Sequence, residues 1–458
     1  MSKVKKAWFC QNCGAESSKW LGRCPSCGAW NTYVEEIIST TPQKTGSLSS
    51  VAGAVPIGQI SMASRERIQL NNNELDRILG GGLVPGSLVL LGGEPGIGKS
   101  TLSLQIPLHS PHLKTLYVSG EESARQIRMR AERLKPSSEG GESHDNCLVF
   151  CETMLENILE EARKTEPSLI IVDSIQTVYS QNLDPSPGSV TQVRECAALL
   201  LKYAKENHVP VILVGHITKE GSIAGPKVLE HIVDVVLQFE GDTTHAYRIL
   251  RSIKNRYGST AELALFQMTQ KGLREVENPS EMLIPMHDEN LSGIAVAAML
   301  DGTRPFLIET QALVSTAAYG TPQRSATGFD TRRMNMLLAV LEKRAGFHLS
   351  AKDVFLNMAG GLRVSDPAVD LAVAAAILSS AFDTVIPSHW CFAAEVGLSG
   401  EIRPVPHLER RIAEADRLGF QKIFISGYNA PAHIPKGIRI EVEKVTGMGT
   451  LGRRIFKT

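Results

Sequence analysis

The sequence has no excess of charge of either sign and no long apolar run. Its 48 Lys and Arg residues balance 48 Asp and Glu residues, so contact with nucleic acid must come from local clusters or from assembly of several copies. The longest apolar run, residues 371–378, is far too short to span a membrane. The basic residues 1–6 lead into Trp8 without an apolar stretch, which argues against a secretory signal peptide. We therefore expect a cytoplasmic protein with no membrane partner.

Cysteine is sparse except at the N-terminus, where four of the eight cysteines fall within the first 27 residues. They form two C-x-x-C-G motifs separated by ten residues, with Cys10 and Cys13 in the first and Cys24 and Cys27 in the second. The spacing lets both thiolates of a motif face one ion, and the following glycine permits a tight turn. Four unrelated cysteines are the alternative, but the duplicated spacing favours a structural zinc site with no open coordination position.

The 458 residues are enough for about three domains. We expect a zinc-binding module over residues 1–30 and a linker over 31–66, where Ser, Thr, Gly, Pro and Val dominate without a sustained period. The main domain is expected over 67–278 and a further domain over 279–458. This last segment again mixes strands with helices, notably at 370–381 and 408–418.

Short apolar runs alternate with amphipathic segments through the main domain. We expect strands at 87–91, 115–119, 169–172 and 211–214, and helices at 101–108, 123–134, 155–164 and 193–207. This alternation is typical of an α/β domain with a mostly parallel sheet. Around residues 247–253 apolar and polar residues alternate strictly, which predicts antiparallel strands at the edge of the sheet.

A phosphate-binding loop follows the first of these strands. The segment matches G-x-x-x-x-G-K-[ST] and consists of Gly93, Glu94, Pro95, Gly96, Ile97, Gly98, Lys99 and Ser100, followed by Thr101 in the expected helix. The glycines let backbone N–H groups face phosphate oxygens, and the helix N-terminus adds partial positive charge. Lys99 would contact the β- and γ-phosphates, and Ser100 would bind magnesium. We therefore expect ATP and magnesium at this loop.

Three carboxylates are candidates for the chemistry beside the loop. Asp173 ends the strand expected at 169–172, where an aspartate can hold magnesium through water. Glu121 and Glu122 follow the strand at 115–119, a position suited to polarising the attacking water. An acidic pair that merely favours a helix N-terminus is the alternative. The sequence does not choose between the two glutamates.

Several motifs occur together and in order along the chain. They are the cysteine motifs, L-G-G-G at 79–82, the phosphate-binding loop, S-G-E-E-S at 119–123, K-N-R-Y-G at 254–258 and A-E-V-G-L-S-G-E-I-R-P at 394–404. On these motifs the chain closely resembles the bacterial RadA/Sms DNA repair and recombination ATPases over essentially its whole length. One departure is Tyr257, where that family usually has Phe; the ring is kept, and we expect little change in role.

The resemblance implies a RecA-like ATPase domain in a hexameric ring. Such a ring would move on single-stranded DNA and drive branch migration of branched intermediates made with RecA. Lys254 and Arg256 would then act on ATP bound to the neighbouring subunit, although without the resemblance this basic strand reads as a solvated edge. His216 resembles the residue that senses the γ-phosphate. The resemblance also suggests three DNA contacts near the central channel: Arg194, Lys219 and Lys227.

The third domain resembles the proteolytic domain of Lon. Ala368 stands where that family has its Ser nucleophile, and Arg411 stands where it has the Lys base. Alanine has no nucleophilic atom and a guanidinium stays protonated, so we expect the fold without the peptidase chemistry. A set of cations in this domain either contacts DNA or forms a solvated helical face: Arg324, Arg332, Arg333, Lys343 and Arg344.

The sequence is compatible with four hypotheses for the function of the protein. The leading hypothesis is a DNA-dependent ATPase motor in homologous recombination. A Lon-type ATP-dependent protease is the second, and the missing Ser and Lys argue against it. A nucleotide-switched binding protein is the third, with zinc docking a partner. An autokinase similar to KaiC is a more distant fourth.

Overall fold

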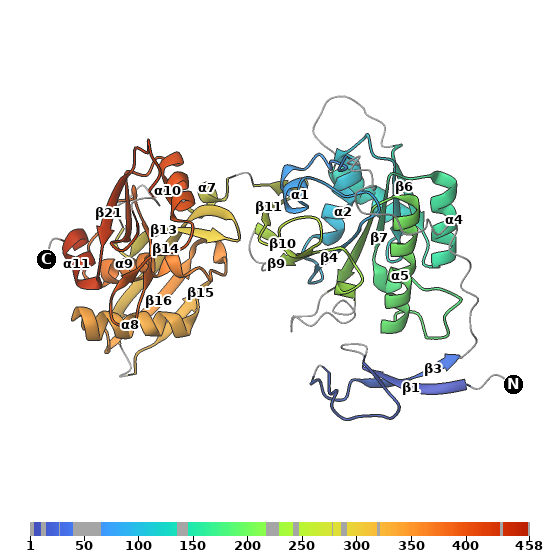
Figure 1. Ribbon diagram of the computed structural model, residues 1–458, viewed down its shortest axis with the longest axis horizontal. Coiled ribbons are helices and arrows are strands. Elements are labelled where there is room, and N and C mark those ends of the chain that lie inside the picture. Colours follow the sequence, from blue (N-terminus) through green and yellow to red (C-terminus); the bar gives the residue numbers. More distant parts are fainter. Residues whose placement is uncertain are drawn as a thin grey trace, which may run out of the picture. The chain divides into compact units, whose positions relative to one another are not determined.

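The computed structural model describes residues 4–10, 15–26, 28–39, 66–134, 145–216, 229–240, 247–276, 278–284, 291–317, 321–430 and 434–456 (Figure 1). The chain divides into two units, Met1–Glu275 and Val276–Thr458. Each unit has hydrophobic cores of its own.

The N-terminal module is a small antiparallel sheet. Its strands are β1 (Val4–Cys10), β2 (Glu16–Ser17) and β3 (Tyr33–Ser39), in the order β2-β1-β3. Cys10 pairs with Tyr33 across β1 and β3, and these two residues form a core with Cys24. A core of this size is too small to stabilise a module unaided, so a bound metal ion suits the fold.

The main domain is built on a nine-stranded sheet in the order β12-β11-β10-β9-β4-β8-β7-β5-β6. Its strands are β4 (Leu88–Gly93), β5 (Thr115–Ser119), β6 (Cys147–Cys151), β7 (Leu169–Asp173), β8 (Val211–His216), β9 (Val235–Glu240), β10 (Tyr247–Asn255), β11 (Leu263–Thr269) and β12 (Gly272–Glu275). Strands β4 to β9 pair in parallel, and β10 to β12 continue the sheet antiparallel. The predicted α/β class with a mostly parallel sheet is confirmed.

Helices cover both faces of this sheet. They are α1 (Asn73–Ile78), α2 (Lys99–His109), α3 (Ala124–Leu134), α4 (Leu155–Thr165) and α5 (Val190–Asn207). Alternate residues of β4 point to opposite faces. Val89 and Leu91 join the core under α1, α2 and α3, while Leu88 and Leu90 join the core under α4 and α5. Figure 1 shows α4 and α5 on the same side of the sheet.

Four strands of the sheet, β6, β9, β11 and β12, were not predicted by range from the sequence. β6 is the outermost parallel strand, and its partly exposed residues give no clear alternation. β9 lies next to β4 and is mostly buried. β10 has the predicted antiparallel pairing, but it is an internal strand, because β11 and β12 lie beyond it.

The second unit has a seven-stranded sheet in the order β15-β16-β14-β13-β17-β20-β21. Its strands are β13 (Ile294–Asp301), β14 (Arg304–Thr316), β15 (Arg324–Thr327), β16 (Lys352–Met358), β17 (Trp390–Ala393), β20 (Lys422–Ser426) and β21 (Glu441–Val445), with β18 (Glu395–Val396) and β19 (Ile402–Arg403) forming a separate pair. The helices are α7 (Pro279–Leu283), α8 (Thr331–Ala345), α9 (Asp370–Ala381), α10 (Leu408–Arg417) and α11 (Met448–Phe456).

Helix α9 forms the centre of this unit. Its first ten residues, 370–379, are all buried, so the longest apolar run of the sequence is a core helix. Helices α8, α9 and α11 pack in one core and α10 in the other. Among the described residues, no helix is long and apolar enough to cross a membrane.

Candidate active site

The phosphate-binding loop connects the buried strand β4 to α2. Gly98 caps α2 with a φ of 119°, a conformation that residues with a Cβ rarely adopt. A Cβ at this position would also lie 2.9 Å from the Met268 side chain. The loop therefore needs glycine here for backbone conformation and for space. The first turn of α2 carries Lys99, Ser100 and Thr101, as the motif predicts.

Lys99 is buried and points back into the loop. Its Nζ donates to the carbonyl oxygens of Gly93 and Glu94, each at 2.9 Å. Burial lowers the pKa of Lys99 to about 8, against the opposing attraction of Asp173 and Glu121. An incoming phosphate would supply a stronger acceptor than these carbonyls, and its negative charge would favour the protonated amine.

Asp173 lies at the carboxyl end of β7 and is held by a buried tyrosine. The Tyr117 hydroxyl donates to Asp173 Oδ2 at 2.8 Å, and its oxygen lies 3.4 Å from Ser103 Oγ. Burial raises the pKa of Tyr117 well above its usual value, and the charge of Asp173 raises it further. Tyr117 therefore stays a neutral donor that fixes the orientation of the carboxylate.

The structure distinguishes Glu121 from Glu122 by their partners, a distinction that the sequence could not make. Glu122 forms an ion pair with Arg130 on α3. Glu121 lies on the other side, where Ser174 Oγ donates to its Oε1 at 2.5 Å. Ser174 directly follows Asp173, and the charge of Glu121 acts on Lys99, so Glu121 is the glutamate on the side of the phosphate-binding loop.

Gly120 allows this approach. Its N–H donates to the Asp173 carbonyl at 3.1 Å, which joins the S-G-E-E-S segment to the end of β7. A Cβ on Gly120 would lie 2.0 Å from Thr177 Oγ1, a distance that real side chains do not reach. The absence of a side chain at position 120 therefore sets the position of Glu121.

The K-N-R-Y-G segment lies at the end of the sheet opposite to the phosphate-binding loop. Asn255 pairs with Val235, and Val235 pairs with Val89 near the start of β4. The loop begins after Gly93, at the other end of β4. The four residue steps from Val89 to Gly93 correspond to about 13 Å along the strand. Lys254 and Arg256 therefore lie towards the end of the sheet that is away from the phosphate-binding loop of their own subunit.

Both cations of this segment have partners in their own subunit. Lys254 Nζ donates to the carbonyls of Glu230 at 2.5 Å and Val233 at 2.8 Å. Burial lowers the pKa of Lys254, and the nearby Arg256 lowers it further. Arg256 Nη1 lies 3.3 Å from Asp234 Oδ1, and its side chain is 54% exposed. Arg256 is thus held at one point with its remaining donors near solvent.

The residues suggested for sensing and DNA binding are only partly described. His216 ends β8 in register with Gly93, so its backbone lies beside the phosphate-binding loop. Arg194 is on α5, half-exposed and 3.3 Å from Glu195. Lys219 and Lys227 lie outside the described residues.

In the second unit, Ala368 and Arg411 lie in the same buried region. Asp366 Oδ1 accepts from the Ala368 N–H at 3.0 Å, and its Oδ2 lies 2.5 Å from Arg411 Nη1. Arg411 Nη1 and Nε also donate to the carbonyls of Ala298 at 3.0 Å and Pro406 at 3.2 Å. The guanidinium is 1% exposed. An internal ion pair thus occupies the region where the Lon resemblance places the Ser and Lys.

Arg333 on α8 is partly buried and pairs with a buried carboxylate. Its Nε and Nη2 contact the buried Asp370 at 2.6 and 2.5 Å. This bonding raises the pKa of Arg333, while burial raises the pKa of Asp370. The Arg333 side chain is 32% exposed, and its pair with Asp370 connects α8 to the start of α9.

Comparison with known proteins gives three matches to family models along the chain. Residues 8–35 match a rubredoxin metal binding domain, residues 67–222 an AAA domain, and residues 310–429 the subunit ChlI of Mg-chelatase. The chain is 47% identical to the DNA repair protein RadA of Bacillus subtilis, with 96% of each chain covered. It is 47% identical to RadA of Listeria monocytogenes, covering 100% of this chain and 99% of that one. RadA of Aquifex aeolicus is 49% identical, with 97% and 96% covered.

The chain belongs to the RadA family of DNA repair proteins. Its architecture is the one that the sequence predicts, with an N-terminal zinc ribbon, a RecA-like ATPase domain and a C-terminal Lon-like domain. The ATPase domain makes this RadA family member an ATP-hydrolysing enzyme. ATP and magnesium are its implied ligands.

In the zinc ribbon of this RadA family member, Cys10 and Cys24 each begin a turn with the same backbone hydrogen bond. The N–H of Cys10 donates to the carbonyl of Ala15 at 3.0 Å, and the N–H of Cys24 donates to that of Ala29 at 2.8 Å. Both thiols are buried, at 0% and 1% exposure. Paired turns that bury cysteine sulfur suit a zinc ion. Cys13 and Cys27 lie outside the described residues.

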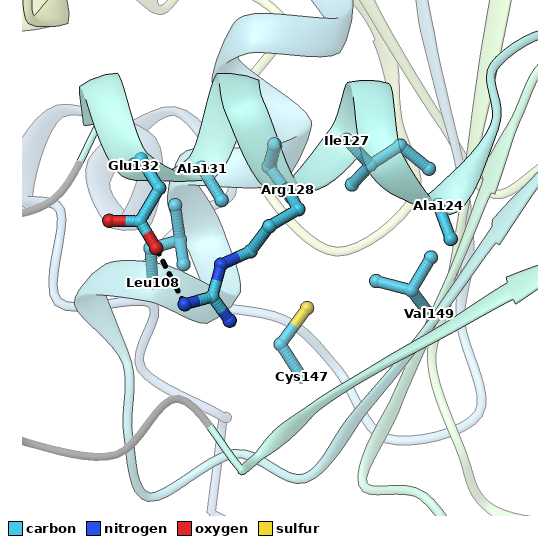
Figure 2. Close-up of a pocket in the computed structure, with 9 residues that line it drawn as sticks. Leu108, Ala124, Ile127, Arg128, Ala131, Glu132, Cys147 and Val149 are labelled. Carbon is cyan, nitrogen blue, oxygen red and sulfur yellow. Dashed lines mark ion pairs between the residues drawn. The ribbon is translucent and has the colours of Figure 1, made fainter.

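A separate cavity of about 110 Å³ lies between α2, α3 and β6. It is lined mainly by apolar side chains, including Leu108, Ile127 and Val149, and Figure 2 shows these beside the ion pair of Arg128 and Glu132. Burial raises the pKa of Cys147 in this cavity to about 11, so the thiol stays protonated. Its lining includes none of the residues assigned to phosphate or magnesium.

Sequence reasoning missed three residues that shape the RadA site. Tyr117 lies inside an apolar strand, and Ser174 follows a predicted strand without a motif of its own. Asp234 precedes the unpredicted strand β9, and its partners lie far away in sequence. An acidic residue just before an apolar run was the only available signal for Asp234.

Proposed function

We propose that this protein is a DNA-dependent ATPase motor in homologous recombination. In this proposal it works in the cytoplasm as a hexameric ring, translocates on single-stranded DNA and promotes branch migration of branched intermediates made by RecA. One observation carries the proposal. The phosphate-binding loop and the K-N-R-Y-G segment lie at opposite ends of one sheet, which supports a catalytic site completed by a second subunit.

The residues of one subunit would bind and orient the nucleotide. Lys99 would leave the loop carbonyls for the β- and γ-phosphates, and Ser100 and Asp173 would hold magnesium. Magnesium, when bound, neutralises charge on the phosphate oxygens. Glu121 would accept a proton from the attacking water, aligned by the hydroxyl of Ser174.

The neighbouring subunit would supply Lys254 and Arg256. A guanidinium that reaches the γ-phosphate stabilises the charge of the transition state and is worth about 10³–10⁵-fold in rate in related phosphoryl transfers. His216, at the end of β8, would sense the γ-phosphate. Arg194, Lys219 and Lys227 would contact the DNA backbone in the channel.

The other two modules would have structural roles. The zinc ion, held by Cys10, Cys13, Cys24 and Cys27, would stabilise the ribbon. The Lon-like domain would act as a scaffold without peptidase activity, because Ala368 has no nucleophilic atom and Arg411 is bound to Asp366.

The test is ATP hydrolysis with and without single-stranded DNA. We expect stimulation by DNA, and loss of hydrolysis in Lys99→Ala. Equal rates with and without DNA, together with no DNA binding, would contradict the proposal. Branch migration and strand displacement then distinguish a motor from a nucleotide-controlled binding protein, and casein digestion tests for a protease.

A further inference from the structure

Asp234 is a buried carboxylate that connects three parts of the ATPase domain. Its side chain is 1% exposed. Its Oδ2 accepts from the N–H of Leu88 at 3.1 Å and lies 2.7 Å from Lys205 Nζ, while Oδ1 lies 3.3 Å from Arg256 Nη1. Its own N–H donates to the Leu88 carbonyl at 2.9 Å. The start of β4, helix α5 and the K-N-R-Y-G segment therefore meet at one carboxylate.

Asp234 contacts Arg256 through backbone and side chain together. The N–H of Arg256 donates to the carbonyl of Asp234 at 3.1 Å, while the guanidinium approaches the carboxylate with a single nitrogen. A mostly exposed arginine has many rotamers, and each side chain that is ordered costs free energy. The ion pair to Asp234 restricts those rotamers before a partner subunit arrives.

Lys205 supports the same arrangement from α5. Its Nζ donates to Asp234 and also to the Tyr257 hydroxyl at 2.9 Å, and it lies 5.6 Å from the centre of the Tyr257 ring. On the other side, Arg67 Nη2 donates to the Tyr257 carbonyl at 2.7 Å. The backbone that follows Arg256 is thus fixed on two sides.

We propose that Asp234 is the positioning residue for Arg256, and that it holds this arginine ready to complete the nucleotide site of the adjacent subunit. The proposal rests on the proposed function, since it requires Arg256 to act across a subunit boundary. Asp234 does not touch the nucleotide in this scheme. Its effect on hydrolysis passes through Arg256.

The first test is Asp234→Asn, which keeps the shape of the side chain and its acceptor for Leu88. Because small displacements of a catalytic group cost up to about 100-fold, we expect DNA-stimulated ATP hydrolysis to fall about 10- to 100-fold. Affinity for an ATP analogue should stay within about twofold, since the phosphate-binding loop is distant. Glu160→Gln, which weakens an exposed pair with Lys164 on α4, is the control and should keep its activity. Wild-type hydrolysis by Asp234→Asn would overturn the proposal.

The decisive test mixes variants in one assembly. Lys99→Ala subunits have a defective phosphate site but an intact Arg256, whereas Asp234→Asn subunits have the reverse. In randomly mixed rings about a quarter of the boundaries join an intact site to an intact arginine, so activity should return when the two inactive proteins are mixed. A purely structural defect in Asp234→Asn would not be rescued by mixing.

A parallel mixture of Lys99→Ala with Arg256→Ala distinguishes the role of Asp234 from the sharing of the nucleotide site between subunits. Recovery in this mixture alone would overturn the role of Asp234 and leave the shared site standing. Recovery in neither would contradict the shared site itself.

Should Asp234→Asn fail to fold, Lys205→Met replaces it in the same mixtures. This variant removes one of the two cations at Asp234, and we expect a smaller loss of activity that mixing rescues. Lys202→Met, one turn earlier on α5, is its control. An unrescued loss in Lys205→Met would overturn the proposal.

Discussion

Replacing Glu121 by glutamine tests the assignment of the water-activating residue. The amide keeps an oxygen that can accept from Ser174 Oγ, which donates to Glu121 at 2.5 Å, so the local structure should survive. It cannot take a proton from water. Loss of a general base typically costs about 10²–10⁴-fold in rate, which corresponds to about 2.7–5.4 kcal/mol in activation free energy.

Glu122→Gln is the matched control. It weakens the ion pair with Arg130, whose side chain is 22% exposed while that of Glu122 is 30% exposed. The hydrogen bond from Ser174 to Glu121 does not involve this pair. We expect the ATPase rate of this variant to stay within about twofold of wild type.

The assay is steady-state phosphate release with single-stranded DNA present, alongside binding of a fluorescent ATP analogue. Glu121→Gln should bind the analogue normally and fail to turn over. A rate within about threefold of wild type for Glu121→Gln, or a larger loss in Glu122→Gln, would refute the assignment.

Three other predictions concern single side chains. Arg411→Met leaves Asp366 without its buried partner and should lower the free energy of unfolding by about 3–5 kcal/mol in urea titrations. The control is Arg417→Met, which removes the pair between Arg417 and Glu414. It should lower the free energy of unfolding by less than about 1 kcal/mol. Affinity for ADP should fall about tenfold per pH unit above pH 8, because Lys99, whose pKa is about 8, must then take up a proton to bind phosphate. In calorimetric titrations the affinity of Lys99→Arg should lack this pH dependence. A wild-type affinity that does not change with pH would contradict the prediction. Tyr257→Phe removes the hydroxyl that Lys205 contacts. It should lower the free energy of unfolding by less than about 1 kcal/mol in thermal unfolding and leave the ATPase rate unchanged. A large loss of ATP hydrolysis would show that the aromatic ring without its hydroxyl does not support activity.

Local patterns were sufficient to predict the α/β class and the strands next to the phosphate-binding loop. The phosphate-binding loop predicts a strand before it and a helix after it, and β4 and α2 are found there. Strand β6 was missed because it lies at the sheet edge, where Val149 is exposed and burial does not alternate. The apolar run within residues 370–379 was correctly excluded as a membrane span, and its complete burial follows from packing on both sides.

Site geometry depends on contacts between residues far apart in sequence. Glu121 and Glu122 are equivalent in the sequence, and only their partners Ser174 and Arg130 distinguish them. In the same way Arg333 reads as a surface cation until Asp370 is seen beside it. Local periodicity carries no information about such pairs, because each partner comes from a different element.

The most direct test of the central claim is an image of the assembly with an ATP analogue and single-stranded DNA. We predict a ring in which Arg256 of each subunit contacts the γ-phosphate bound at Lys99 of the next. A monomer, or a ring in which Arg256 stays on its own Asp234 far from every phosphate, would contradict the account.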